Sequence, residues 1–365
     1  MGDLNGDGAN DLFVCGFSGT GGNLVYTGDG KGGFAHVCRD TGRPAWWTLQ
    51  YGQECDSQNI FGSFNHALIL DLNADGHADI FGVAGGGTRY FLGDGDMGFT
   101  QVQSGDAVLP QCGAHPDPTP GHTAAADLNG DSHIDLYVSC GAGVESRLLL
   151  GDGQGVFTAQ AGPAASGPAA GKAMHTSIGH LNGDAHEDLF VCMYGDSSDV
   201  KSQIYYGGGD GTFTAEADDS WQSSYNGGCA SCLADLTGDG NLDIYVAYHS
   251  APNELYAGDG SGGFARTYTD DTRHDHPLTS WDTHSATKQA ICEDLDGDQH
   301  LDVYMSCEGA GTDNMLFHGD GAGNFVRDTT SPAALGGGRS RHTAAADLNG
   351  GASTSFLKMI LSDTP

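Results

Sequence analysis

The sequence has few positive charges and no long apolar run. Its 365 residues contain 14 Lys and Arg against 48 Asp and Glu, so the formal net charge is −34. A chain this acidic repels nucleic acid and anionic membrane surfaces and attracts cations. No apolar stretch approaches the ~18 residues that a membrane-spanning helix needs. We therefore expect no nucleic-acid partner and no membrane span.

Signals of several enzyme classes are also missing. The sequence contains no serine nucleophile elbow, no phosphate-binding loop and no dinucleotide fingerprint. The carboxylates and histidines outside the repeated segments described below show no spacing typical of an acid–base pair. We therefore expect that the chain is not an enzyme, and keep a polysaccharide lyase or dehydratase as the alternative.

The ten cysteines leave the redox state open. An even number permits disulfides. However, Cys15, Cys140, Cys192 and Cys307 each end the same apolar run of a repeat, which also suits a small buried hydrophobic residue. The pair C-x-x-C at residues 229–232 has no second pair, so it predicts zinc only weakly.

One acidic nine-residue segment recurs along the chain, first as DLNGDGAND from Asp3. Successive copies start 68, 56, 53, 55, 59 and 53 residues apart. We call each copy an acidic loop and number its positions 1 to 9. The six intact loops span residues 3–11, 71–79, 127–135, 180–188, 235–243 and 294–302, and a seventh, at 347–351, is degenerate.

Each repeat predicts four short strands. In the third repeat the strand-forming runs are GHTAAA, LYVSC, RLLL and TAQ, and GDGQGVF separates the last two. The glycines of this GDG segment allow the positive φ angles of a tight hairpin. Four-stranded units of roughly 55 residues indicate an all-β β-propeller, which we expect to occupy residues 1–350 as a single domain.

The number of blades depends on how the ring closes. The chain begins inside a repeat, which we interpret as a truncation or an incomplete gene model, and no signal peptide is visible. If residues 341–346 supply the missing inner strand of the first blade, the chain forms six closed blades. The alternative is an incomplete seven-bladed propeller. Residues 351–365 fit no repeat position and are expected to form an off-pattern tail.

The acidic loops offer oxygen atoms at alternate positions, as calcium requires. Positions 1, 3, 5 and 9 carry side-chain oxygens, position 7 can add a backbone carbonyl, and glycine at position 4 or 6 permits the sharp turn. The predicted calcium ligands are Asp3, Asn5, Asp7, Asp11, Asp71, Asn73, Asp75, Asp79, Asp127, Asn129, Asp131, Asp135, Asn182, Asp184, Asp188, Asp235, Thr237, Asp239, Asp243, Asp294, Asp296, Asp298 and Asp302.

The loops differ in their expected affinity. The fourth has His180 at position 1 and should bind weakly, because calcium prefers oxygen. The seventh has Gly351 where an acid is needed and should not bind. Asp, Asn and Gly also form turns without any ion, but five copies with the same oxygen spacing favour calcium. We expect about five structural Ca²⁺ sites and a weaker sixth at residues 180–188.

These motifs resemble the FG-GAP or VCBS repeat family. The resemblance rests on DLNGDGANDLFV from Asp3 and on NELYAGDGSGGF from Asn253, and it covers nearly the whole chain. The family includes the calcium-binding propellers of integrin α-subunits, and propellers of the cartilage acidic protein type are similar. The resemblance implies an extracellular or cell-surface protein that binds calcium and a ligand, usually with seven blades.

A second group of residues falls away from the acidic loops. Four histidines lie five residues before position 1 of the following loop, and the tryptophans lie in the longest segments between blades. They form a pocket for a transition metal, a sugar or an anion, or else they are structural, with histidines hydrogen-bonded on inner strands and tryptophans packing the loops. This group comprises His66, His122, His175, His342, Trp46, Trp47, Trp221 and Trp281.

The sequence thus predicts a secreted or cell-surface binding, adhesion or matrix-interaction module. Its calcium ions would stabilise the blades, and its partner would be a protein or a glycan. The alternatives are a lectin and a carbohydrate lyase or dehydratase on the same propeller.

Overall fold

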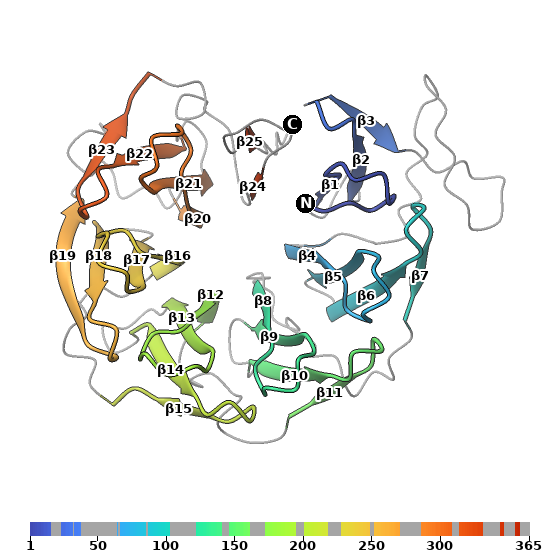
Figure 1. Cartoon of the computed structure of the whole chain (residues 1–365), viewed down its shortest axis with the longest axis horizontal. Helices are drawn as coiled ribbons and strands as arrows, with labels where there is room; N and C mark the ends of the chain where they lie inside the picture. Colours follow the sequence, from blue (N-terminus) through green and yellow to red (C-terminus); the bar gives the residue numbers. More distant parts are fainter. Residues whose placement is uncertain are drawn as a thin grey trace.

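The chain forms six blades arranged in a ring (Figure 1). The computed structural model describes residues 1–15, 23–31, 33–37, 64, 66–84, 87–102, 122–140, 146–160, 172–194, 201–217, 228–248, 252–270, 286–308, 314–330, 344–346 and 355–357. The fold is therefore the six-bladed all-β propeller that the repeats predict. No helix in these ranges is long and apolar enough to cross a bilayer.

The second to sixth blades are antiparallel sheets of four strands in chain order. The predicted strands of the third repeat are confirmed in β8 to β11. The strands are β4 (His66–Leu70), β5 (Asp79–Ala84), β6 (Gly87–Gly93) and β7 (Phe99–Gln101); β8 (His122–Ala126), β9 (Asp135–Ser139), β10 (Arg147–Gly151) and β11 (Phe157–Ala159); β12 (Lys172–Gly179), β13 (Asp188–Tyr194), β14 (Gln203–Gly207) and β15 (Phe213–Ala215); β16 (Gly228–Ala234), β17 (Asp243–Tyr248), β18 (Asn253–Gly258) and β19 (Phe264–Asp270); and β20 (Ala286–Glu293), β21 (Asp302–Glu308), β22 (Met315–Gly319) and β23 (Phe325–Asp328).

The first blade has three strands, β1 (Leu12–Val14), β2 (Leu24–Gly28) and β3 (Phe34–Val37). Only an isolated bridge between Gly2 and Asp11 stands at the place of its inner strand. This bridge has the same register as Ala126 opposite Asp135 in the third blade. The first acidic loop is therefore shaped as in the complete blades.

The expected closure of the ring by residues 341–346 is wrong. Within that segment β24 (Ala344–Ala346) pairs with β25 (Ser355–Leu357), not with the first blade. This hairpin is a separate two-stranded sheet between the sixth and first blades (Figure 1). Residues 355–357, expected in the off-pattern tail, instead repeat the register of the other inner hairpins, because Ala346 stands opposite Ser355 as Ala126 stands opposite Asp135.

Apolar side chains between neighbouring blades form the core. The cluster between the second and third blades joins Phe81 and Tyr90 to Leu136 and Phe157, and the rings of Tyr90 and Phe157 meet edge to face at 5.7 Å. All residues of β9 are buried, because a blade is covered on both faces by its neighbours. Each fully buried large side chain contributes roughly 1.5–3 kcal/mol of transfer free energy.

Candidate metal-binding loops

Each acidic loop lies just before the second strand of its blade, and every loop except the fourth turns around a position-1 carboxylate. In the third loop, Asp127 Oδ1 accepts a hydrogen bond from Gly130 N and Oδ2 accepts one from Ser132 N, each at 2.7 Å. The first and fifth loops repeat this pattern with Asp3 and Asp235. A short polar side chain thus folds the loop so that its alternate positions curl around one centre.

The position-9 aspartate joins two hairpins of the same blade. Asp135 is fully buried, and its Oδ2 accepts a hydrogen bond from Leu128 N at 2.9 Å. Its Oδ1 accepts one from Gly151 N, in the GDG hairpin between the third and fourth strands, at 2.8 Å. The acidic loop and the GDG hairpin therefore lie on one face of the ring. The same two contacts recur at Asp11, Asp79, Asp188, Asp243 and Asp302, all fully buried.

Burial raises the pKa of every one of these position-9 carboxyls. At Asp79 the pKa rises to about 6, and the nearby charges of Asp75 and Asp71 add to the effect of desolvation, while the two backbone hydrogen bonds oppose it. A cation beside these oxygens would favour the ionised form. The all-oxygen ligand set and the buried carboxylate therefore fit calcium.

The loops also hold neighbouring blades together. Leu128 O, at position 2 of the third loop, accepts a hydrogen bond from Gly211 N of the fourth blade's hairpin at 3.1 Å, and Leu236 O accepts one from Gly323 N at 3.0 Å. A Cβ atom on Gly183, at position 4 of the fourth loop, would lie 2.1 Å from Gly260 O of the fifth blade. An ion that rigidifies a loop would therefore also stabilise the contact between two blades.

Three loops place a residue with a side chain in the left-handed region. Ala74 has a φ of 57°, Ser132 of 68° and Gln299 of 75°. This conformation costs roughly 1–2 kcal/mol for a residue other than glycine. The hydrogen bonds to the position-1 carboxylate hold Ser132 and Gln299 there.

The fourth loop lacks the position-1 carboxylate and differs in shape. His180 Nε2 lies 3.5 Å from Glu187 Oε1. Ala185, at position 6, is not among the described residues with positive φ, whereas Ser132 and Gln299 at the same position are. The loop keeps Asn182, whose side-chain amide donates to Asp184 at 2.8 Å. Without a carboxylate at position 1, the backbone at position 6 does not adopt the left-handed turn seen in the third and sixth loops.

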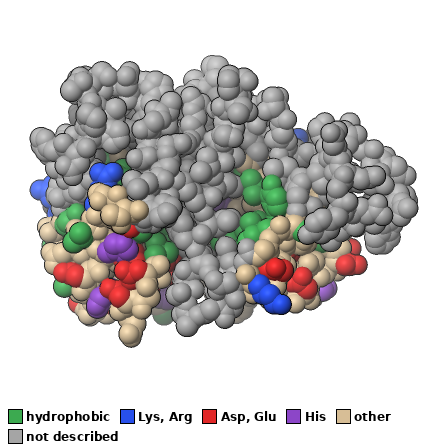
Figure 2. Space-filling model, turned by 90° about the horizontal axis from the view of Figure 1, so that it is seen from above, with side chains coloured by type: hydrophobic (Ala, Val, Ile, Leu, Met, Phe, Trp, Pro, Cys, Tyr) green, Lys and Arg blue, Asp and Glu red, His purple; other side chains and the backbone are tan. Residues whose placement is uncertain are grey.

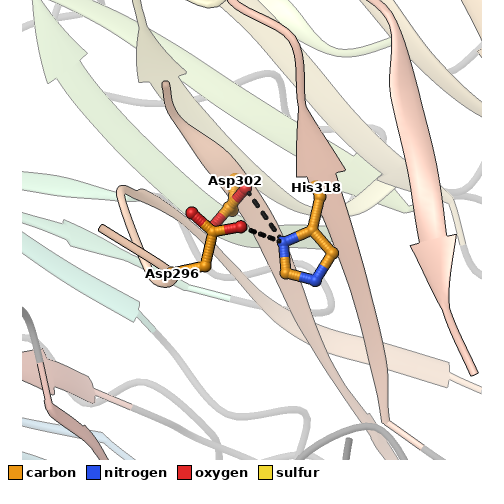
Figure 3. Close-up of side chains that lie close together, drawn as sticks. All are labelled: Asp296, Asp302 and His318. Carbon is orange, nitrogen blue, oxygen red and sulfur yellow. Dashed lines mark ion pairs between the residues drawn. The ribbon is translucent and has the colours of Figure 1, made fainter. Parts of the chain in front are cut away.

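The sixth loop is the most acidic. Carboxylate oxygens of Asp294, Asp296 and Asp298 all lie within 4.8 Å of one another. His318, on the neighbouring strand β22, joins Asp296 and Asp302 in a second group of the same size (Figure 3). His318 was not predicted from the sequence, although a signal was present. The corresponding residues in the other blades, in chain order, are Thr27, Leu92, Leu150, Tyr206 and Ala257.

Acidic side chains gather on the surface that the loops form. Figure 2, which views the ring edge-on, shows Asp and Glu side chains in red in the lower part of the described surface, with purple His side chains near them. The GDG hairpins add further aspartates. Hydrogen bonds from backbone N–H groups hold the pKa of Asp152 below its usual value, so it stays ionised at neutral pH.

Three of the four predicted inner-strand histidines form a stack. The ring centroids of His66 and His122 lie 4.2 Å apart, and those of His122 and His175 lie 3.9 Å apart. His66 Nδ1 accepts a hydrogen bond from Thr123 N, and His122 Nδ1 accepts one from Thr176 N, each at 3.4 Å. A neutral ring that accepts through Nδ1 carries its proton on Nε2. These contacts support the structural interpretation of the three rings.

The rest of the predicted second group lies outside the described residues. These residues are His342, Trp46, Trp47, Trp221 and Trp281. The degenerate seventh loop at residues 347–351 also lies outside the described residues.

The cysteines answer the question of redox state in part. Cys232 and Cys292 form a disulfide between the inner strands β16 and β20 of neighbouring blades, with their Cα atoms 5.9 Å apart. Cys140 is also in a disulfide. The weak prediction of zinc at residues 229–232 is therefore wrong, because Cys232 has another covalent partner. Cys15, Cys192 and Cys307, at the same repeat position as Cys140, are thiols, so both interpretations of this position occur in the chain.

The repeats belong to a known type. The model of the FG-GAP-like repeat family matches residues 71–138 and 180–246, so these two regions are FG-GAP-like repeats. The matched regions contain the second, third, fourth and fifth acidic loops. No curated protein sequence matches the chain significantly.

Several solved structures resemble the chain at low sequence identity. A lectin of Agrocybe aegerita that recognises non-reducing terminal N-acetylglucosamine is 19% identical, with 89% of this chain and 77% of that one covered and a TM-score of 0.53. The fungal Aleuria aurantia lectin, a six-bladed β-propeller that recognises fucose, is 14% identical over 89% and 96%, with a TM-score of 0.47. The Vibrio cholerae biofilm matrix protein Bap1 is 17% identical over 79% and 43%, with a TM-score of 0.44.

Proposed function

We propose that the chain is a secreted or cell-surface binding module whose propeller is stabilised by calcium in its acidic loops. The observation that carries the proposal is the buried position-9 carboxylate, which recurs in all six blades and ties the acidic loop to the GDG hairpin. Calcium bound beside it offsets the cost of a buried charge and binds only the folded chain, so it stabilises the fold by mass action.

The disulfide supports an oxidising compartment. Disulfides persist in secreted and cell-surface proteins and are rare in the reducing cytosol. Cys232 and Cys292 lie 60 residues apart in sequence and join two blades, so their bond closes a long loop of the chain. The strong negative charge adds independent support, because calcium is abundant outside cells and the acidic loops need a cation.

Glycans are the first ligand class to examine. The lectin of Agrocybe aegerita shares the fold of this chain and recognises a terminal sugar. The likeness concerns the fold alone, so the sugar specificity of this chain would depend on its own residues. A protein ligand in adhesion or in a matrix is the other class, and a lyase or dehydratase activity stays an untested alternative.

Calcium binding is tested by titrating the chelated protein while following heat and melting temperature. About five ions per chain with a large rise in melting temperature are expected. Magnesium is the matched control, since it demands octahedral geometry and gives up its waters reluctantly. If calcium has no more effect than magnesium, the calcium part of the proposal is wrong.

Ligand binding is tested on a glycan array with the calcium-loaded protein. Loss of signal in Trp221→Ala or Trp281→Ala, with an unchanged melting temperature, would identify a lectin. A blank array would move the search to protein partners. Release of unsaturated products from uronate polysaccharides would instead identify a lyase and contradict the binding-module proposal.

A further inference from the structure

The sixth blade carries two substitutions that no other blade has. Position 3 of its acidic loop is Asp296, where the first four loops have asparagine and the fifth has Thr237. The residue before its GDG hairpin is His318, where the other blades have threonine, leucine, tyrosine or alanine. The two positions are 22 residues apart in sequence, yet the fold brings them into contact (Figure 3).

His318 faces two carboxylates through one nitrogen. Its Nδ1 lies 3.1 Å from Asp296 Oδ2 and 3.4 Å from Asp302 Oδ1. Two ligand atoms at ~2.0–2.2 Å from a tetrahedral ion lie roughly 3.3–3.6 Å apart, so these separations suit a shared ion. Nδ1 is shut off from solvent and makes no hydrogen bond among the described residues. Nδ1 is thus close to two carboxylate oxygens but forms a hydrogen bond with neither, as expected of a nitrogen that shares an ion with them.

The other nitrogen of the ring faces a third carboxylate. His318 Nε2 lies 3.6 Å from Asp328 Oδ2, on strand β23. Histidines that bind metals generally donate their second ring N–H to a carboxylate or carbonyl, which fixes the tautomer and the ring orientation. Asp328 is placed to do this for His318.

We propose that Asp296, Asp302 and His318 bind a divalent transition-metal ion such as Zn²⁺, with Asp328 as the residue that positions the imidazole. Imidazole suits zinc and other late transition metals, whereas calcium prefers an all-oxygen set. The side chains of Asp296 and His318 are 39% and 33% exposed, so the group lies at the protein surface although Nδ1 itself is covered, while Asp302 anchors it from the interior. The site shares Asp296 and Asp302 with the sixth acidic loop, so zinc and calcium would compete for these two carboxylates, and it does not depend on calcium binding in the other five blades.

The experiment titrates Zn²⁺ and Co²⁺ into the intact protein after calcium and chelator have been removed. Isothermal titration gives the affinity, and the intensity of the visible absorption of Co²⁺ reports tetrahedral coordination. The informative variants copy residues of other blades, so the fold accepts them. His318→Leu reproduces Leu150, and Asp296→Asn reproduces Asn129.

We expect one zinc ion per chain that is lost, or weakened at least tenfold, in His318→Leu. Asp328→Asn should weaken zinc 10–100-fold, as removal of such outer partners does. The double change Asn129→Asp with Leu150→His should add a second zinc site in the third blade. Equal zinc affinity in His318→Leu and the unchanged protein would overturn the proposal. Failure of the unchanged protein to bind zinc would also overturn it, and would leave His318 as a structural neighbour of its three carboxylates. The melting temperatures without metal show that the variants are folded.

Discussion

The fourth and sixth acidic loops each involve a histidine, but at opposite places relative to the carboxylates. His180 replaces the position-1 aspartate of the fourth loop and removes the acceptor that folds the loop. His318 comes from a neighbouring strand and adds a nitrogen to a loop that keeps all its carboxylates. The same residue type therefore removes a carboxylate from one loop and places a nitrogen beside the carboxylates of another. What a histidine does here depends on which atoms of the loop it displaces or approaches.

Both loops nevertheless keep the position-9 contact, in Asp188 and Asp302. This separates two roles of an acidic loop. Joining the hairpins of a blade needs only the buried aspartate, whereas holding an ion needs the position-1, position-3 and position-5 oxygens as well. The following changes distinguish the two roles and are arranged by decreasing size of the expected effect.

Removal of the position-9 carboxylate should have the largest effect. Asp188→Ala and Asp302→Ala each leave two buried N–H groups without an acceptor, at about 1–3 kcal/mol per group. In chelator the two variants should lose similar free energies of unfolding, measured by denaturant titration. In calcium only Asp302→Ala should fall further behind the unchanged protein. Asp259→Ala, in an exposed hairpin, is the control and should lose much less stability. Equal losses of stability in all three variants would contradict the proposed role of the position-9 aspartate in joining the two hairpins.

The fourth loop should be needed for the contact between blades even without an ion. Gly183→Ala combines a left-handed φ of 77° with a Cβ only 2.1 Å from Gly260 O, whereas Gly240 has a φ of 89° and nothing within 4 Å. Gly240→Ala should lose about 1–2 kcal/mol from backbone strain alone. Gly183→Ala should lose clearly more in the same thermal unfolding measurement. Equal losses would show that the close approach to the fifth blade does not matter.

Restoring the carboxylate should convert the fourth loop to the type of the others. His180→Asp supplies the missing acceptor, and Ala185→Gly allows the left-handed turn at position 6. The double variant should bind one more calcium ion by titration. The added ion should stabilise by about 2.7 kcal/mol at a calcium concentration 100 times its Kd. Without calcium, its melting temperature should change little, and an unchanged calcium stoichiometry would contradict the assignment of position 1.

The calcium-free protein should respond to pH through Asp79. Its folded pKa of about 6 lies above the unfolded value, so the folded state binds more protons than the unfolded state between roughly pH 4 and 6. Stability contributed by this group therefore rises as the pH falls from 7 to 5. The melting temperature in chelator, compared with that of Asp79→Asn, isolates the effect. In saturating calcium the sign should reverse, because protons compete with the ion.

The smallest effect is expected at Gln299, which holds a φ of 75° in the sixth loop. Gln299→Gly removes the left-handed strain but adds conformational freedom to the unfolded chain, so the net gain in stability should be at most about 1 kcal/mol. A rise in melting temperature that is larger in chelator than in calcium would show that the ion already holds this turn. A fall in both conditions would show that the added freedom of the unfolded chain outweighs the relief of strain.

Much of the fold could be predicted from the sequence because its signals are local. The strands of the third repeat follow from alternating apolar runs and GDG turns, and they are observed at β8 to β11. The acidic loops follow from oxygen spacing within nine residues. The inner hairpin at β24 and β25 was misassigned, because whether residues 344–346 pair with the first blade or with residues 355–357 depends on ring closure.

The candidate sites show the same limit. Positions 1 to 9 of each loop were identified from the sequence, and the structure brings Asp294, Asp296 and Asp298 together as expected. The histidine stack was visible as a shared repeat position, but its hydrogen bonds to the next inner strand were not. His318 was missed because its partners lie in another hairpin, and its unusual character appears only when the blades are aligned with one another.

Local sequence patterns specify the four-stranded repeat, the acidic loops and the excess of carboxylates over bases, because each depends on residues close together along the chain. Three other features depend on the folded structure: Cys232 pairs with Cys292, each GDG hairpin receives a buried aspartate, and His318 meets Asp296 and Asp302. These pairings join residues 14 to 60 positions apart. Their distances are set by how strands register within a blade and how blades pack around the ring, which no local pattern specifies.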